Sequence, residues 1–531
     1  MNRIGKSVLI VALLVALTGF AFASGGAQQS TAAAAGPAKV SYWMDLAADK
    51  VAPVFKNVGD TQMYKEIMKR LNIQITFLHP PVGQGRDQFN LIIASQDLPD
   101  MMEWGLNGYP GGPAKAISDG VAIKHNDVIA KYAPNLSALY KAHPDWEKLS
   151  KTDDGALYGF PFVRGDPALM VFYGPVFRQD FLTELGLKVP ATIDDWYVTL
   201  KALKEKKGIQ YPFSFRQKGT GQDGNDFFTG GGLSGAWGVT RGFYLDEKKD
   251  VKFGPIEAGW KDFVVTMAKW YKEGLIDPDF PVQDLKTWRA KVMDGQAAAF
   301  LGYTGGGIGY FYDNVLKTNP KFKLVGAPNP VLKAGTKSRF GQMDWDVPNP
   351  SNTFITPKNK SVEASAKFLD YGYGKEGEML YNFGIEGVSY KMTNNYPKYT
   401  EIVTKNPNGQ PMSLAMTDFM RSHYAGPFVQ RVEYFEQFLV YPDQLQAVKN
   451  WAGSSDFSSR LPNVTPSPDE SSKTATIMNE INVYTDEMLM KWIMGQASMD
   501  QWDSYVAQVQ KMGIDEALNL QRAALARFNK R

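Results

Sequence analysis

The stretches Lys39-Val-Ser-Tyr-Trp-Met44 and Asn72-Ile-Gln-Ile-Thr-Phe77 decide the fold of the first part of the chain. The second alternates apolar and polar residues as a half-buried strand does, and the first also predicts a strand. Between them Thr61 to Leu71 has helical spacing, Gln88 to Ser95 predicts a further helix, and Leu98 to Trp104 predicts a short strand. This alternation of strands and helices is typical of a parallel α/β lobe.

A second unit begins near Leu169, where Leu169 to Tyr173 predicts a buried strand. Arg178-Gln-Asp180 opens a helix that Gly186 ends. Thr192 and Asp195 have the spacing of a capping box at the start of the next helix. Further strands are expected at Tyr211–Phe215 and Ala297–Leu301, and further helices at Phe263–Tyr271, Trp288–Met293, Ser361–Gly372, Lys375–Phe383 and around Ile477–Trp492.

The first residues have the pattern of an export signal. Arg3 and Lys6 precede an apolar run from Val8 to Leu17, and Ala21-Phe22-Ala23 is a cleavage pattern. We therefore expect a signal peptide at 1–23 and a disordered linker at 24–38, because the linker is rich in Ala, Gly, Ser and Thr. An uncleaved membrane anchor is the alternative. No cysteine is present to carry a lipid, so a free, soluble, exported protein is expected.

The composition narrows the chemistry further. The 531 residues include no cysteine, which excludes disulfides, thiolate zinc sites and a cysteine nucleophile. The formal net charge of +3 is too small for a nucleic-acid-binding protein. Aromatic residues make up 13% of the chain, and Tyr and Trp suit stacking on sugar rings as well as core packing. The length implies at least two domains or lobes.

No catalytic or metal-binding motif is found. The four histidines show no H-x-x-x-H spacing, and no G-x-S-x-G or calcium-loop pattern occurs. Asp344, Asp346 and Glu386 are candidates for a pair of glycosidase carboxylates, but 55 acidic residues make this pattern weakly specific. We expect no catalytic residue, no metal and no cofactor.

The order of segments resembles an extracellular solute-binding protein of an ABC importer, in the large family-1 class that binds oligosaccharides. Four passages carry the resemblance: Gln88–Asp100 with its Leu-Pro-Asp end, Arg178–Pro190 with Thr192 and Trp196, Gly295–Tyr303, and Gly384–Tyr390 together with Met512–Leu518. The second and fourth are the most specific. The likeness runs from about Lys39 to the C-terminus and is strongest to the long subfamily that includes alginate-oligosaccharide binders.

The resemblance implies a type II periplasmic-binding-protein fold. Two α/β lobes would be joined by several crossover strands and would close on ligand by a hinge. Crossings are expected near Gly165–Leu169, Pro348–Thr353 and 400–410. Lobe one would then be 39–167 plus 352–405, and lobe two 168–351 plus 406–531. The implied partners are an oligosaccharide and the membrane permease, with the protein acting as a monomer in the periplasm.

Ligands of open α/β sheets lie beyond the carboxyl ends of the strands, and this rule gives the expected ligand-binding residues. They are aromatic platforms and polar groups from both lobes: Trp43, Asp45, Trp104, Tyr158, Arg178, Trp237, Tyr303, Asp344, Trp345 and Glu386.

Two other functions stay open at this stage. One is an exported carbohydrate-active enzyme such as a glycosidase or lyase, and the other is a binder of a non-sugar solute such as a peptide. Relatives often carry an acidic calcium loop before the strand at Tyr211. Here Lys204-Glu-Lys-Lys-Gly-Ile-Gln210 stands instead, so calcium is not expected.

Overall fold

The computed structural model describes residues 36–48, 50–216, 232–348, 353–421 and 424–531. The predicted signal peptide and all but the last three residues of the predicted linker lie outside the described residues. Residues 38–531 form one compact unit, and the remainder of this section concerns that unit.

The first sheet has the strand order β10-β3-β1-β2. β1 (Ala38–Trp43) pairs in parallel with β2 (Ile73–Leu78) and β3 (Met101–Glu103), and β10 (Thr353–Ile355) adds an antiparallel edge. Side chains of β2 are alternately buried and exposed, as the sequence pattern predicts. The predicted strand–helix order is confirmed, because α1 (Gln62–Leu71) and α2 (Gly85–Ser95) connect these strands.

The second sheet has the order β5-β8-β4-β9 and is mixed. β4 (Tyr173–Arg178) runs antiparallel to β8 (Ala297–Tyr303) and β9 (Leu324–Gly326), and β5 (Tyr211–Phe213) runs parallel to β8. The predicted strand at Leu169–Tyr173 is wrong, since the strand begins only at Tyr173. Asp166 accepts a hydrogen bond from the Ala168 amide and caps a short 3₁₀ helix, Pro167–Leu169, which takes up the start of the predicted strand.

Two small hairpins complete the strands: β6 (Phe243–Leu245) with β7 (Val251–Phe253), and β11 (Tyr390–Thr393) with β12 (Tyr396–Tyr399). The other described α-helices are α3 (Gly112–Ser118), α4 (Asn126–Tyr132), α5 (Pro134–Ala142), α6 (Pro144–Leu149), α7 (Gln179–Glu184), α8 (Ile193–Lys207), α9 (Ala258–Lys272), α10 (Leu285–Met293), α11 (Tyr310–Val315), α12 (Val362–Tyr371), α13 (Lys375–Phe383), α14 (Glu401–Thr404), α15 (Met412–Phe419), α16 (Val432–Phe438), α17 (Pro442–Gly453), α18 (Pro468–Ile493), α19 (Trp502–Lys511) and α20 (Ile514–Lys530).

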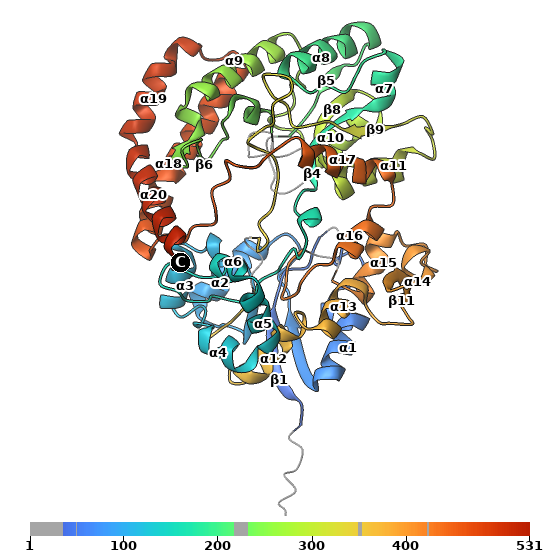
Figure 1. The fold of residues 1–531 in the computed structure, drawn as a ribbon, viewed down its shortest axis with the longest axis vertical. Coiled ribbons are helices and arrows are strands. Elements are labelled where there is room, and N and C mark those ends of the chain that lie inside the picture. Colours follow the sequence, from blue (N-terminus) through green and yellow to red (C-terminus); the bar gives the residue numbers. More distant parts are fainter. Residues whose placement is uncertain (1–35, 49, 217–231, 349–352, 422–423) are drawn as a thin grey trace, which may run out of the picture. The chain divides into compact units, whose positions relative to one another are not determined.

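Each sheet has its own hydrophobic core, as expected of two lobes. Tyr42, Ile67 and Phe368 belong to the core of the first sheet, and Trp196 and Trp260 belong to the core of the second. Helices cover both sheets, and the two α/β groups lie one above the other in Figure 1. The α/β fold class is therefore confirmed.

Helices of the later part of the chain pack against both groups of elements. Residues of α15 and α16 pack with α13 and β12 beside the first sheet, whereas α17 packs on β4 and β9 of the second. These contacts favour a last crossing between Leu439 and Pro442 over the predicted one near 400–410. The predicted lobe limits otherwise stay a prediction, and residues 349–352 of the expected return lie outside the described residues.

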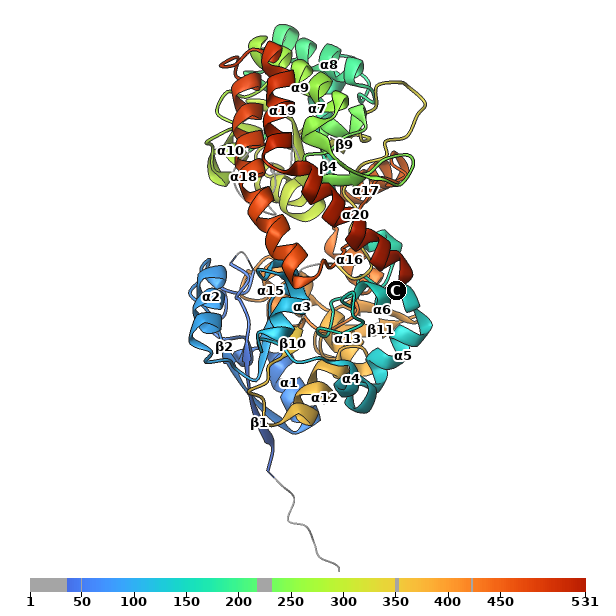
Figure 2. The ribbon, with the colours of Figure 1, turned by 90° about the vertical axis from the view of Figure 1, so that its left-hand side faces the viewer.

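α20 connects the two cores, and α18 packs beside it. Ile514, Ala517 and Leu518 of α20 belong to the core of the second sheet, but Phe528 near its end belongs to the core of the first. Figure 2 shows both helices running along one side of the molecule past the two groups of elements. α20 therefore acts as a strut from one lobe to the other.

Candidate functional site

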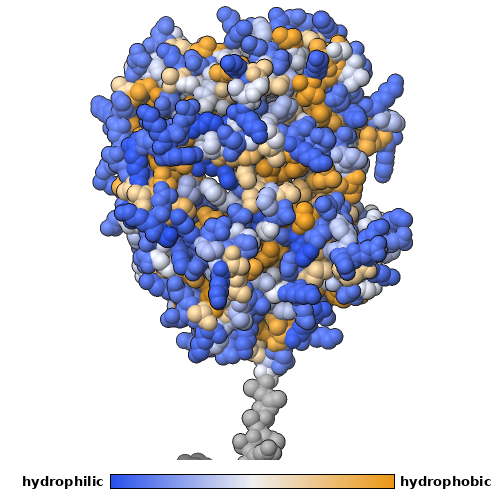
Figure 3. Space-filling view, in the orientation of Figure 1, coloured by the Kyte–Doolittle hydropathy of each residue, from blue (hydrophilic) through white to orange (hydrophobic). Residues whose placement is uncertain are grey.

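A cavity of about 580 Å³ opens beside the second sheet. Its lining comes from the start of β4, the β6–β7 hairpin, the segments 340–345 and 459–461, and one face of α18. The lining residues are Tyr173, Thr240, Arg241, Gly242, Phe243, Tyr244, Phe253, Phe340, Gly341, Gln342, Met343, Asp344, Trp345, Ser459, Arg460, Leu461, Met478 and Asn482. On the face drawn in Figure 3, hydrophilic residues cover most of the surface and apolar residues gather along its middle.

Aromatic side chains form much of the cavity wall. The rings of Tyr244 and Phe340 lie 5.4 Å apart at 64°, and Tyr173 lies 4.6 Å from Tyr303, which ends β8. Tyr303 is in turn stacked on Phe172 with its centroid 5.9 Å away. Such offset and edge contacts hold aromatic rings in fixed orientations. Burial raises the pKa of Tyr244 to about 12, so its hydroxyl stays protonated at neutral pH and can donate a hydrogen bond.

The charged groups in the wall have partners within the protein. Arg241 donates from Nε to Asp486 at 2.6 Å and also pairs with it through Nη2. Asp344 accepts from Arg164 Nε at 2.9 Å. The charges of Arg241 and Asp344 are therefore balanced by neighbouring side chains.

Arg460 and Trp345 form a stacked pair in the wall. The guanidinium of Arg460 lies 4.1 Å from the ring centroid of Trp345, and its Nη1 donates to the carbonyls of Met343 and Asp344 at 3.2 and 2.9 Å. Burial lowers the pKa of Arg460. The stack orients the indole, because a cation over the ring face is attracted by its quadrupole.

Four predicted residues of the first lobe lie close together. Trp104 lies 5.7 Å from Trp43 and is stacked at 5.1 Å on Phe89, and Tyr158 belongs to the same cluster. Gly85, at the start of α2, brings Asp45 to this group: a side chain there would meet Asp45 Oδ2 at 2.7 Å and Trp104 at 3.2 Å. The structure therefore gathers Trp43, Asp45, Trp104 and Tyr158 at the carboxyl end of β1.

Asp45 is the polar group of this cluster. Its Oδ1 is buried and has no hydrogen-bond partner among the described residues. Burial raises its pKa. An unsatisfied buried carboxylate oxygen is costly unless a ligand or water supplies a donor.

Three other predicted residues lie apart from both clusters. Arg178 is buried with Asp180, and its guanidinium lies 3.8 Å from the ring centroid of Phe181. Trp237 packs 5.5 Å from Phe263 of α9, and Glu386 is exposed beside the β11–β12 hairpin. Of the ten predicted residues, Asp344 and Trp345 are the two that line the cavity itself.

Sequence reasoning did not indicate Phe340, Arg460 or Asn482 as site residues. They come from two loops and from the polar edge of α18, and no local pattern distinguishes them from other loop or helix residues. Their place in the wall depends on how distant segments pack.

The segment that replaces a calcium loop also has internal contacts. Lys204 Nζ donates to the carbonyl oxygens of Glu273 and Gly274 at 2.7 and 3.0 Å. An ammonium group therefore links the end of α8 to the end of α9. Among the residues the structure describes, no helix is both long enough and apolar enough to cross a membrane.

Known proteins share both sequence and fold with the chain. Residues 56–379 match the family of bacterial extracellular solute-binding proteins. The chain is 24% identical over 471 residues to the fructooligosaccharide ABC transporter substrate-binding protein FusA of Streptococcus pneumoniae serotype 4, which covers 82% of this chain and 81% of that protein. It is 27% identical over 399 residues to the polygalacturonan/rhamnogalacturonan-binding protein YtcQ of Bacillus subtilis, with 72% of this chain and 74% of that one covered.

The fold agrees with the sequence match. The crystal structure of the alginate-binding protein AlgQ2 is similar with a TM-score of 0.73 and 25% identity, over 92% of this chain and 98% of that one. The predicted two-lobed architecture of binding proteins is thereby confirmed. The chain belongs to the bacterial extracellular solute-binding protein family.

Proposed function

We propose that the protein is the periplasmic receptor of an ABC importer, which captures an oligosaccharide between its lobes and delivers it to the permease. The observation that carries this proposal is the cavity of about 580 Å³ with its aromatic wall. Its volume lies in the range of about 300–1,000 Å³ that is usual for small-molecule sites. The names of the relatives, which bind fructooligosaccharide, polygalacturonan or alginate, support a carbohydrate as the solute.

The chemistry of the wall suits sugars. Flat aromatic faces such as those of Phe243 and Trp345, which are partly exposed, match the apolar faces of pyranose or furanose rings. Gln342, Asn482 and the protonated hydroxyl of Tyr244 offer hydrogen bonds to sugar hydroxyl groups. We assign Asp344, Trp345 and, behind Tyr173, Tyr303 to one half of the site.

The other half of the site would come from the first lobe. Trp104 would supply an aromatic face there, with Trp43 and Tyr158 buried in the same cluster, and the unpartnered oxygen of Asp45 is an acceptor for a sugar hydroxyl. A ligand that touches both halves stabilises a closed arrangement of the lobes. Contact of Arg178, Trp237 and Glu386 with ligand stays a prediction of the sequence alone.

Binding without catalysis is the reading that the cavity favours. Glycoside hydrolysis needs two carboxyl groups about 5–10 Å apart that face the same bond. Asp344 is the only carboxylate among the described residues that line the cavity, and it is held by Arg164. The family is a binding-protein family, which agrees.

The proposed setting is the periplasm. Cleavage after Ala23 would release a free protein, because no cysteine is present to carry a lipid. The protein would act there as a monomer that meets the permease in the membrane.

A thermal-shift screen of the protein starting at Ser24 tests the proposal. The panel holds fructooligosaccharides, oligogalacturonides, alginate oligosaccharides and short peptides, and chromatography follows every hit. A ligand at 100 times its dissociation constant stabilises by about 2.7 kcal/mol, which raises the midpoint by about 2–3 °C for a protein of this size. We expect one class of sugar to give this shift and to be recovered intact.

Variants of two aromatic residues sharpen the screen. Trp345→Ala should weaken sugar binding about 30-fold, because it removes a central aromatic contact. Tyr197→Ala, in α8 outside the cavity lining, is the matched control and should bind like the wild type. Recovery of a cleaved sugar would indicate an enzyme, and shifts with peptides alone would indicate a different solute.

A further inference from the structure

Arg164 lies where three distant segments of the chain meet. Its side chain is buried, and it donates from Nε to Asp344 Oδ2 at 2.9 Å and from Nη1 to Gln430 Oε1 at 3.0 Å. Its backbone amide donates to the carbonyl of Asp346 at 2.8 Å. Arg164 lies next to the first predicted crossing, which begins at Gly165. It thus contacts the segment of Asp344 and Asp346, which precedes the predicted return, and a third segment around Gln430.

Aromatic rings enclose the same guanidinium. The rings of Phe162, Phe172 and Tyr424 have their centroids 5.2, 4.9 and 5.1 Å from Arg164 Cζ. A planar, permanently charged fork between ring faces and a carboxylate suits Arg and not Lys. The group is therefore held in one orientation from several sides.

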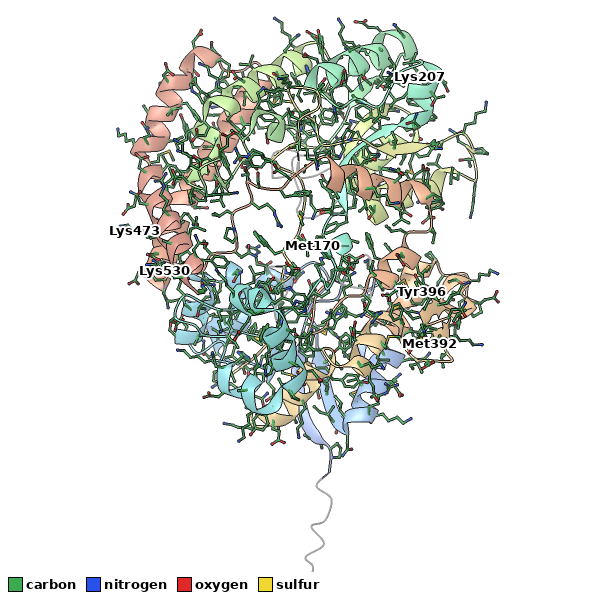
Figure 4. All side chains as sticks on the ribbon, viewed as in Figure 1. Met170, Lys207, Met392, Tyr396, Lys473 and Lys530 are labelled. Atoms are coloured by element: carbon green, nitrogen blue, oxygen red, sulfur yellow. The ribbon has the colours of Figure 1, made fainter. Side chains whose placement is uncertain are left out.

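Backbone contacts bring the three segments close to Arg164. Gln430 N donates to Val163 O at 2.8 Å. Gly165 has a φ of +70°, and a side chain at that position would meet Gln430 O at 2.6 Å, so only glycine fits this approach. On the other side Asp344 N donates to Met170 O at 2.9 Å, and Met170 lies between the two groups of elements in Figure 4.

Asp344 links Arg164 to the cavity wall. Asp344 and Trp345 line the cavity, and Arg164 does not. Asp344 Oδ1 accepts from Gln342 Nε2 at 3.3 Å, and Gln342 Oε1 accepts from the Phe172 amide at 2.9 Å. The orientation of the cavity wall thus depends on contacts that end at Arg164 and at the first crossing.

We propose that Arg164 is a positioning residue, which fixes the segment bearing Asp344 and Trp345 relative to the first crossing and so couples the geometry of the cavity wall to the relative position of the lobes. This inference deepens the proposed function, because the wall it positions is the proposed sugar site. Arg164 acts through Asp344 and touches no ligand itself.

The first test measures lobe geometry without any ligand. Because the chain has no cysteine, Lys206→Cys and Lys398→Cys, at exposed positions of α8 and β12, accept spin labels at these two sites alone. The distance distribution between the labels is recorded by electron–electron double resonance. We expect Arg164→Gln and Asp344→Asn each to broaden it, and the double variant to broaden it no further than either single variant.

Lys291→Gln is the matched control. It breaks a buried ion pair of similar kind, in which Lys291 Nζ lies 2.8 Å from Asp277 Oδ2, but both residues belong to the second lobe. It should leave the distribution unchanged. If Arg164→Gln fails to fold by circular dichroism, Arg164→Lys takes its place, since it keeps the charge and loses the fork geometry.

The second test uses the sugar with the largest thermal shift in the screen. Arg164→Gln should weaken its binding by about 5- to 150-fold, the usual range for coupling between sites, and the effects of Arg164→Gln and Asp344→Asn should not add. Additive effects on affinity, or an unchanged distance distribution in folded Arg164 variants, would overturn the proposal. If no sugar binds the wild type, the proposed function fails, and the label distances alone still decide the role of Arg164.

Discussion

His125 is a fully buried histidine that makes the stability of the first lobe depend on pH. Its Nε2 accepts a hydrogen bond from the Ile355 amide at 2.9 Å, and its Nδ1 is buried with no partner among the described residues. Burial lowers its pKa to about 4. In the unfolded chain the pKa is about 6.5, so between these values the unfolded state binds a proton that the folded state does not.

The sign of the effect follows from this difference. The contribution that neutral His125 makes to the free energy of unfolding is fully present above pH 6.5. This contribution is lost as the pH falls toward 4. At pH 5 this loss is about 2 kcal/mol relative to pH 7. Urea unfolding at both pH values measures it. His125→Gln keeps a neutral acceptor and should remove most of this difference in the free energy of unfolding between pH 5 and pH 7. His143→Gln is the control and should keep the difference, because His125 remains. The same difference in the wild type and in both variants would contradict the assignment to His125.

Single site residues were predictable only where a local pattern places them. Trp345 and Asp344 lie between Gly341 and Pro348, and this loop pattern indicated two of the residues that line the cavity, while their contact with a ligand stays a prediction. Arg178 looks the same in the sequence as a ligand-binding arginine, yet it pairs with Asp180 in the protein interior. Arg460 gives no local indication at all, since its stack on Trp345 depends on two segments more than one hundred positions apart.

Whole helices were the most predictable features, because their ends are set by neighbouring residues. α13 begins at Lys375 and ends at Phe383, as expected, and Gly384 follows with a φ of +84°. The predicted capping box of α8 is confirmed: Thr192 Oγ1 accepts from the Asp195 amide at 3.1 Å, and Asp195 accepts from the Thr192 amide at 3.0 Å. β4 was misplaced because its start depends on pairing with β8 and β9, which a local pattern does not contain.

The capping box gives a prediction at the scale of one helix. Thr192→Ala should lower the free energy of unfolding by about 1 kcal/mol, because it leaves an amide of the first turn without its acceptor. Thr266→Ala, in the middle of α9, is the control, since its hydroxyl donates only to the carbonyl of Asp262 one turn earlier. Urea unfolding compares the two variants, and equal losses of stability would argue against a role for the cap.

At the scale of the whole molecule the sequence indicated two lobes joined by crossing segments, but not that a C-terminal helix also joins them. Hydrophobic periodicity predicted the helix around Ile477–Trp492 and its buried face. It carried no information that α20 bridges two cores, because that depends on which surface each end of the helix meets. The cluster of Arg527, Asp153 and Glu470 shows this: the three residues are far apart in the chain and form ion pairs at the end of α20.

This strut predicts a local opening that can be measured. Phe528 is buried in the core of the first lobe, and Lys148 lies 4.7 Å from its ring centroid. Truncating a buried Phe costs about 3 kcal/mol, so Phe528→Ala should raise amide exchange of residues 519–531 about a hundredfold. Asp153→Ala removes the carboxylate shared by Arg527 and Arg531, but Arg527 keeps Glu470 and Arg531 keeps the Lys151 carbonyl as partners, so a smaller, roughly fivefold rise is expected.

Hydrogen exchange measured by mass spectrometry shows whether α20 holds the two lobes together or whether only its last turns open. Lys530→Ala, on the same last turn and labelled in Figure 4, should leave exchange unchanged, because its side chain is exposed. Residues 148–157 of the first lobe should become less protected together with the end of α20, since each covers the other. Faster exchange in 519–531 alone would mean that α20 frays without holding the lobes, and the link between the two cores would then rest on the crossing segments around Arg164.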